Sequence, residues 1–70
     1  MRLQHDFQAT QIHGRTGQEV ADCILPADTE FVDLGLHREL WDYEANRPIL
    51  TRLIRVDGFL YRVRADAVNR

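Results

Sequence analysis

The last third of the chain contains a turn signal that constrains the fold more than any other feature. Asp57-Gly58 separates two runs of β-branched, aromatic and other apolar residues interleaved with arginine, at 49–56 and 59–64. A two-residue turn of type I′ needs positive φ at both central positions, and Asp-Gly is a pair that adopts this conformation readily. The sequence therefore predicts a β-hairpin over residues 49–64.

The same turn predicts which side chains share a face of the hairpin, because side chains alternate between the two faces of a strand. The face expected to meet the core contains the pairs Val56–Phe59, Ile54–Tyr61 and Arg52–Val63. The other face is rich in arginine and contains the pairs Arg55–Leu60, Leu53–Arg62 and Thr51–Arg64.

Upstream of the hairpin, residues 39–45 alternate in a way that favours a third antiparallel strand over a helix at 36–46. Asn46-Arg47-Pro48 is then expected to form the turn, since proline cannot continue a ladder. Placing Ala45 opposite Ile49 predicts that Leu40 pairs with Ile54 and Asp42 with Arg52. In this register Trp41 and Tyr43 share the arginine-rich face.

The N-terminal half predicts a second hairpin. Residues 2–13 alternate as a strand, 14–17 contain two glycines, and 18–25 continue as the returning strand. Against this, Thr16 and Glu19 have capping-box spacing, which would start a short helix ended by a proline at 26. We prefer the strand.

Residues 26–29 are expected to be a loop, and 31–36 a short strand in which Gly35 marks a bulge. The pattern as a whole predicts one domain over residues 1–70, either all-β or a β-rich α+β fold with at most one short helix. Its five to six short strands would form a small antiparallel sandwich or barrel.

Composition excludes several enzyme classes. The chain has no serine and no lysine, so it lacks a serine nucleophile, a Schiff-base lysine and the lysine of a phosphate-binding loop. It has one cysteine, Cys23, whose neighbours are apolar or acidic, and such surroundings favour a packed, unreactive thiol. With no signal-peptide pattern, we expect a cytoplasmic protein or part of a particle assembled inside the cell.

Histidines and carboxylates give no convincing site. His5 and His13 on one strand would lie roughly 26 Å apart, too far to share an ion. Zinc sites normally show closely spaced ligand pairs, and no such pair is present in the sequence. We therefore expect no metal, no cofactor, no small-molecule substrate and no catalytic activity.

Charge is distributed unevenly along the chain. Residues 19–46 contain eight acids and one arginine, whereas residues 47–64 contain five arginines and one acid, although the net charge is only −2. The two segments can neutralise each other within the fold or across a dimer, or one of them can meet a charged partner. The acidic segment could also imitate a nucleic acid toward a basic protein.

An aromatic and arginine-rich face is the strongest candidate for function. The predicted partner-binding residues are Trp41, Tyr43, Leu53, Arg55, Leu60, Arg62 and Arg64. Trp, Tyr and Arg are the residue types that dominate protein interfaces, and a chain this short hides only about 60% of its unfolded surface on its own. The sequence favours a non-enzymatic module that docks on a larger protein or self-assembles, without a membrane segment.

The alternative is a nucleic-acid-binding β module in which bases stack on Trp41 and Tyr43, while the phosphates are bound by arginines of this face together with Arg52. The acidic balance of the chain makes this less favoured. In size and as a compact β module without a motif, the chain loosely resembles small accessory proteins of phages, whether virion components or inhibitors of host factors. That resemblance implies no residue roles.

Overall fold

The computed structural model describes residues 1–67 and contains one five-stranded antiparallel sheet. The strands are β1 (Phe7–Ile12), β2 (Glu19–Leu25), β3 (Val32–Asp42), β4 (Arg47–Val56) and β5 (Phe59–Arg64), followed by a single 3₁₀ turn, η1 (Ala65–Ala67). This is the small antiparallel β fold that the sequence predicts. No helix in the described part of the chain is long and apolar enough to cross a membrane.

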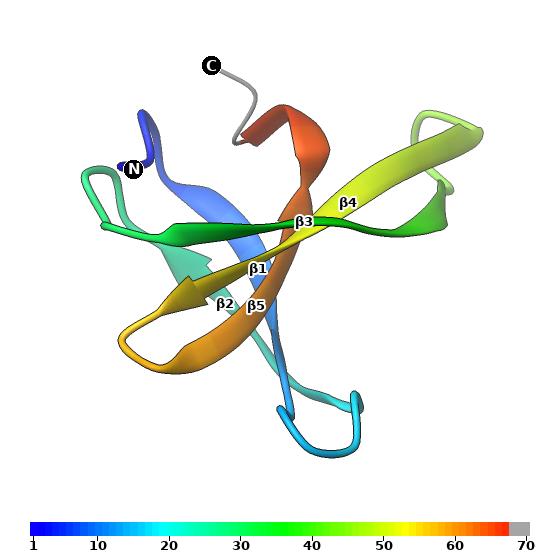
Figure 1. Ribbon diagram of the computed structural model, residues 1–70. Coiled ribbons are helices and arrows are strands. Elements are labelled where there is room, and N and C mark those ends of the chain that lie inside the picture. The colour runs from blue at the N-terminus through cyan, green and yellow to red at the C-terminus, as the bar shows by residue number, and fades with distance from the viewer. Residues whose placement is uncertain (68–70) are drawn as a thin grey trace.

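The strands follow the order β2-β1-β5-β4-β3, so β5 is central and β2 and β3 are the two edges. Strong twist makes β3 cross the direction of β1 and β5, as Figure 1 shows. The N-terminal segment lies beside the loop between β2 and β3, where Arg2 forms an isolated bridge with Glu30 (Figure 1). The sheet therefore has one face closed by these segments and one face that they leave uncovered.

The C-terminal hairpin forms in the predicted register. Val56 pairs with Phe59, and the five further pairs down to Thr51 and Arg64 all match. Asp57 and Gly58 have φ of 50° and 84°, as the type I′ turn requires.

The register of the preceding hairpin differs from the prediction. The turn occupies 43–46, and Arg47 and Pro48 belong to β4, so that Leu40 pairs with Ile49 and Trp41 with Pro48. The predicted pairs of Leu40 with Ile54 and of Asp42 with Arg52 are wrong. Pro48 fits within the strand because the β4–β5 ladder ends at Thr51, which leaves β4 with a single neighbour beyond that point.

The N-terminal hairpin also forms, and residues 19–25 are strand rather than the alternative capping-box helix. The first strand begins at Phe7 instead of residue 2, because the preceding segment bends to bond with the β2–β3 loop. The strands predicted at 31–36 and 39–45 are one strand, β3, whose ladder shifts register between Asp33 and Gly35. Gly35 has a φ of 105°, which confirms the predicted bulge.

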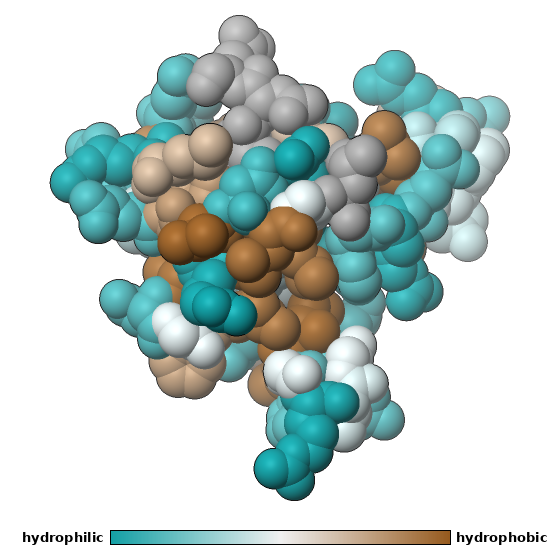
Figure 2. Space-filling view, in the orientation of Figure 1, coloured by the Kyte–Doolittle hydropathy of each residue, from teal (hydrophilic) through white to brown (hydrophobic). Residues whose placement is uncertain are grey.

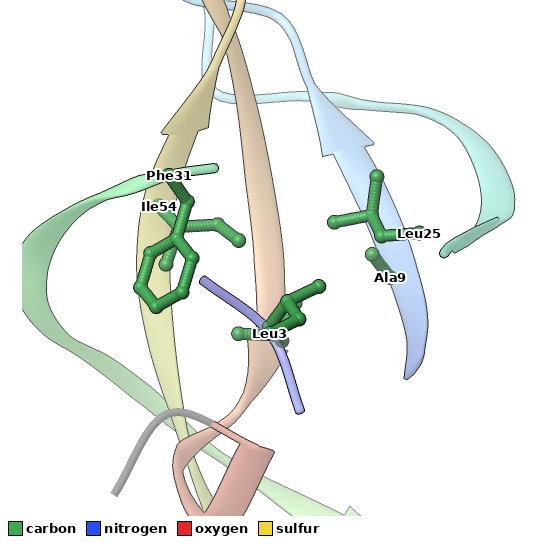
Figure 3. Packing of buried hydrophobic residues seen from close by; sticks show 6 residues of the cluster. Leu3, Ala9, Leu25, Phe31 and Ile54 are labelled. Atoms are coloured by element: carbon green, nitrogen blue, oxygen red, sulfur yellow. The ribbon is translucent and has the colours of Figure 1, made fainter. Parts of the chain in front are cut away.

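The core lies on the closed face of the sheet. Figure 3 shows Leu3 placed between Phe31 and Ile54 on one side and Ala9 and Leu25 on the other. Val63 completes the cluster of buried side chains, and Val56 and Tyr61 pack against it. Phe59 is the exception to the predicted core face: it is exposed, because it stands at the turn end of the hairpin, beyond the buried cluster.

Candidate functional site

The face of the sheet opposite the core is here called the outer face. Strand pairing aligns Ile12 of β1 with Leu60 of β5, Leu60 with Arg55 of β4, and Arg55 with Val32 of β3. Paired residues share a face, so this row crosses four strands. Leu53, Leu60, Arg55, Arg62 and Arg64, five of the seven predicted partner-binding residues, lie on this outer face.

Apolar residues form one part of the outer face. Ile12 is buried, Leu53 and Leu60 are half-buried, and Val32 is exposed. In the view of Figure 2, apolar surface gathers in the centre, between polar projections at the turns near residues 14–17 and 43–46. The molecule therefore does not present a uniformly solvated surface.

A hollow of about 850 Å³ adjoins this apolar part. Its lining comes from all five strands and includes Thr10, Ile24, Leu40, Ile49, Thr51 and Arg64. The buried hydroxyl of Thr51 accepts a hydrogen bond from the Arg38 N–H and donates one to the Arg38 carbonyl. These bonds satisfy the Thr51 hydroxyl within the fold and link β3 to β4 at this point.

Trp41 and Tyr43 line the rim of the hollow, although not as the predicted register placed them. Strand pairing puts Leu40 and Asp42, rather than Trp41, on the outer face beside Ile49 and Arg47. Trp41 and Tyr43 line the hollow from the end of β3 and the turn that follows it. Trp41 is 49% exposed and Tyr43 is 87% exposed, so both rings are accessible.

Arg62 occupies a different environment from the exposed position that the sequence predicts. Its side chain is only 9% exposed, and its guanidinium group donates a hydrogen bond to the Glu19 carboxylate of β2. The two residues are 43 positions apart in sequence, and β1 lies between their strands. This arginine therefore joins one edge of the sheet to its centre.

Arg64 is also paired with acids. Its guanidinium nitrogens lie 3.8 Å from Asp42 Oδ2 and 3.3 Å from Asp66 Oδ2. Two of the three arginines of the predicted face, Arg62 and Arg64, are thus paired with acids within the fold, which was one of the two interpretations of the uneven charge pattern. Arg55, the third, is exposed.

Arg52 and Asp33 form another ion pair, at the bulge of β3 and on the side of the sheet that faces the core. Arg52 donates to Asp33 through Nε at 3.1 Å, and its Nη2 lies 2.9 Å from the other carboxylate oxygen. Gly35 N–H donates to the same carboxylate at 2.9 Å. The hydrogen bonds from Arg52 and Gly35 lower the pKa of Asp33 below its ordinary value, against a smaller opposing effect of desolvation.

This lowered pKa predicts a pH-dependent contribution to stability. The ionised carboxylate stabilises the fold at pH values above its unfolded pKa, and that contribution is lost as pH falls through the folded pKa. We expect Asp33→Asn to lower the free energy of unfolding at pH 7. On acidification below about pH 4, the free energy of unfolding of the variant should fall less than that of the wild type. Urea unfolding at several pH values measures this. Glu39→Gln, at an exposed position on β3, is the control. Parallel pH curves for wild type and Asp33→Asn would contradict the prediction.

His13 and Cys23 take structural positions. The Nδ1 of His13 accepts hydrogen bonds from the N–H groups of Arg15 and Thr16 in the β1–β2 turn. Cys23 is half-buried and packs against the core. Partial desolvation lowers the pKa of His37, and the nearby charges of Arg62 and Arg38 lower it further. Residues 1–67 hold no group of three or more His, Cys, Asp or Glu placed to bind a metal ion.

The site therefore differs from its prediction mainly in the lining residues that β1 and β2 contribute. The hairpin register brings together the residues of β4 and β5, but the contributions of Thr10, Asp22 and Ile24 depend on how β1 and β2 join β5. No turn signal in the sequence specifies that long-range pairing. Searches against family models, curated proteins and solved structures found no match to the chain.

Proposed function

We propose that the chain is a non-enzymatic protein-binding module that docks on a larger protein through its outer face, with the hollow at the centre of the contact. The observation that carries this proposal is the exposure of Trp41 and Tyr43 where they line the hollow. Tryptophan and tyrosine are enriched among the residues that supply most of the binding energy in protein interfaces. The occupant is a convex apolar element of the partner.

The charges of the site support a protein partner over a nucleic acid. Arg62 is paired with Glu19, and Arg64 is close to Asp42 and Asp66. The lining also contains Asp22 and Glu44. A phosphate backbone would have to displace acids from these arginines and approach others that remain, whereas an apolar protein surface gains contact without disturbing the ion pairs.

The aromatic rim provides the direct test. A double variant, Trp41→Ala with Tyr43→Ala, is expected to weaken binding of the partner by tenfold or more, since interface hot spots contribute about 2 kcal/mol or more each. The partner is first captured with the wild-type chain from lysate and then titrated in purified form. Urea unfolding of the double variant is measured alongside, because Trp41 is only 49% exposed and its truncation removes some packing, whereas Tyr43 is 87% exposed.

Phe59→Ala is the matched control, because Phe59 is an exposed aromatic residue outside the lining of the hollow. It should leave the affinity unchanged. Equal affinity of the double variant and the wild type would contradict the proposal. Binding of single-stranded DNA or RNA at low salt that falls steeply with added salt would favour the nucleic-acid alternative instead. A concentration-dependent oligomer disrupted by the double variant would identify the partner as a second copy of the chain.

A further inference from the structure

The two edges of the sheet differ in how well they are protected from pairing with another strand. The β3 edge has register shifts at two places and a glycine with positive φ at Gly35. Bulges of this kind bend an edge strand and discourage the addition of a further strand. The β3 edge is therefore protected.

The β2 edge is less protected. In residues 1–67, β2 pairs with β1 and with no other strand, and its register is regular from Ala21 to Leu25. Five of its seven residues are exposed, among them Val20 at 55% and Ile24 at 65%. It has no proline or lysine along its length. Its outward backbone groups and branched side chains are available to an incoming extended segment.

The charges of β2 define the chemistry of that segment. Glu19 and Asp22 are its charged residues, and both are acidic. Glu19 is already paired with Arg62, whereas Asp22 accepts a hydrogen bond from the neutral hydroxyl of Thr10 at 2.9 Å. By alternation, Asp22 and Ile24 lie on the same face. The best-suited added strand would place a basic residue opposite Asp22 and a branched apolar residue opposite Ile24, two positions apart.

A second copy of β2 fits this edge poorly. In the antiparallel, twofold-symmetric register that pairs all seven residues, Asp22 lies opposite the Asp22 of the other copy. Like charges directly opposite each other destabilise a strand pair. The geometry and the charges both favour a foreign segment of complementary sequence.

We propose that the free edge of β2 binds an extended basic and apolar segment of a protein partner by strand addition. The proposal rests on the protein-binding function above for the class of ligand, but it uses different residues from the aromatic rim. Asp22 and Ile24 also line the hollow, so the added strand would run along one border of that site.

The test uses two capped synthetic peptides, Thr-Val-Thr-Arg-Thr-Val-Thr and the same sequence with Glu in place of Arg, added to the full chain. The arginine peptide is expected to shift the NMR signals of the β2 amides and to slow their hydrogen exchange. We expect it to bind about two- to fivefold more tightly than the glutamate peptide, in line with the size of cross-strand charge effects.

Variants of the chain test whether Asp22 sets the peptide preference and whether the peptide binds at the β2 edge. Asp22→Arg should reverse the preference between the two peptides, whereas Glu39→Arg, at the protected edge, should leave it unchanged. Ile24→Ala, which removes apolar contact without adding a charge, should weaken both peptides. Far-UV circular dichroism confirms that each variant is folded before it is compared.

Several results would overturn strand addition at β2. They are the absence of any change at the β2 amides, changes confined to β3, and an unaltered preference in Asp22→Arg. Protection of β2 that grows with protein concentration in the absence of peptide would assign the edge to a second copy and overturn the proposal too. The Trp41→Ala with Tyr43→Ala variant should still bind the arginine peptide, so failure of the hollow as a docking site is distinguishable from failure at this edge.

Discussion

Replacing Ile54 with alanine is expected to unfold most of the protein at room temperature. Ile54 is 0% exposed, and its strand is paired with β3 on one side and β5 on the other. Truncation of a buried isoleucine costs about 2–5 kcal/mol, because apolar contact is lost and a cavity remains. A core in a domain of this size rarely provides more than about 3–5 kcal/mol in total. Urea unfolding followed by far-UV circular dichroism measures the loss.

Leu50→Ala is the matched control for this substitution. Leu50 lies in the same strand and, by alternation, on the same side as Ile54, but it is exposed. Its truncation should change the free energy of unfolding by no more than about 0.5 kcal/mol. If the two variants lose similar stability, the core is not centred where the structure places it.

The C-terminal hairpin could be predicted to the residue because its turn is specified locally. The Asp57-Gly58 pair restricts the turn type, the turn type fixes the register, and the register assigns every side chain to a face. Ile54 and Val63 were therefore correctly assigned to the core face. Local chemistry was sufficient because the two strands are adjacent in sequence.

The next hairpin was mispredicted because two turn signals compete within a few residues. Pro48 suggested a turn at 46–48, yet the chain turns at 43–46. There the Asp42 carboxylate accepts hydrogen bonds from the N–H groups of Glu44 and Ala45, and Asn46 adopts a φ of 56°. Aspartate and asparagine favour these roles, so the sequence did contain the correct signal. The effect of Pro48 depends on where the neighbouring β5 ends, and only the tertiary structure determines that.

The uneven charge pattern was identified from the sequence, but its pairing was not. Asp33, Glu19 and Asp42 all belong to the acidic segment, and all three contact arginines of the basic segment. Which acid meets which arginine depends on the β1–β5 pairing and on the register of β3, neither of which has a local determinant. The gathering of Leu53, Leu60 and Arg62 on one face was predictable, whereas the burial of Arg62 was not.

Near the N-terminus, the position of Leu3 could not be predicted from the local sequence either. Alternation alone places Leu3 in a strand, yet the segment leaves the sheet and its leucine inserts between the two halves of the core (Figure 3). Backbone bonds hold it there: Leu3 N–H donates to the Thr29 carbonyl at 3.1 Å, and Asp28 N–H donates to the Leu3 carbonyl at 2.8 Å. The segment thus covers a core that the sheet alone would leave open.

We expect Leu3→Ala to lower the free energy of unfolding by about 2–5 kcal/mol, since Leu3 is only 1% exposed and its truncation removes apolar contact and leaves a cavity. Arg2→Ala is the control. It keeps the backbone bridge to Glu30 and removes an exposed ion pair, for which about 0–1 kcal/mol is expected. Urea unfolding of both variants decides the matter. Equal losses would mean that the segment is held by its backbone and surface charge, whereas a much larger loss for Leu3→Ala would show that its side chain is part of the core.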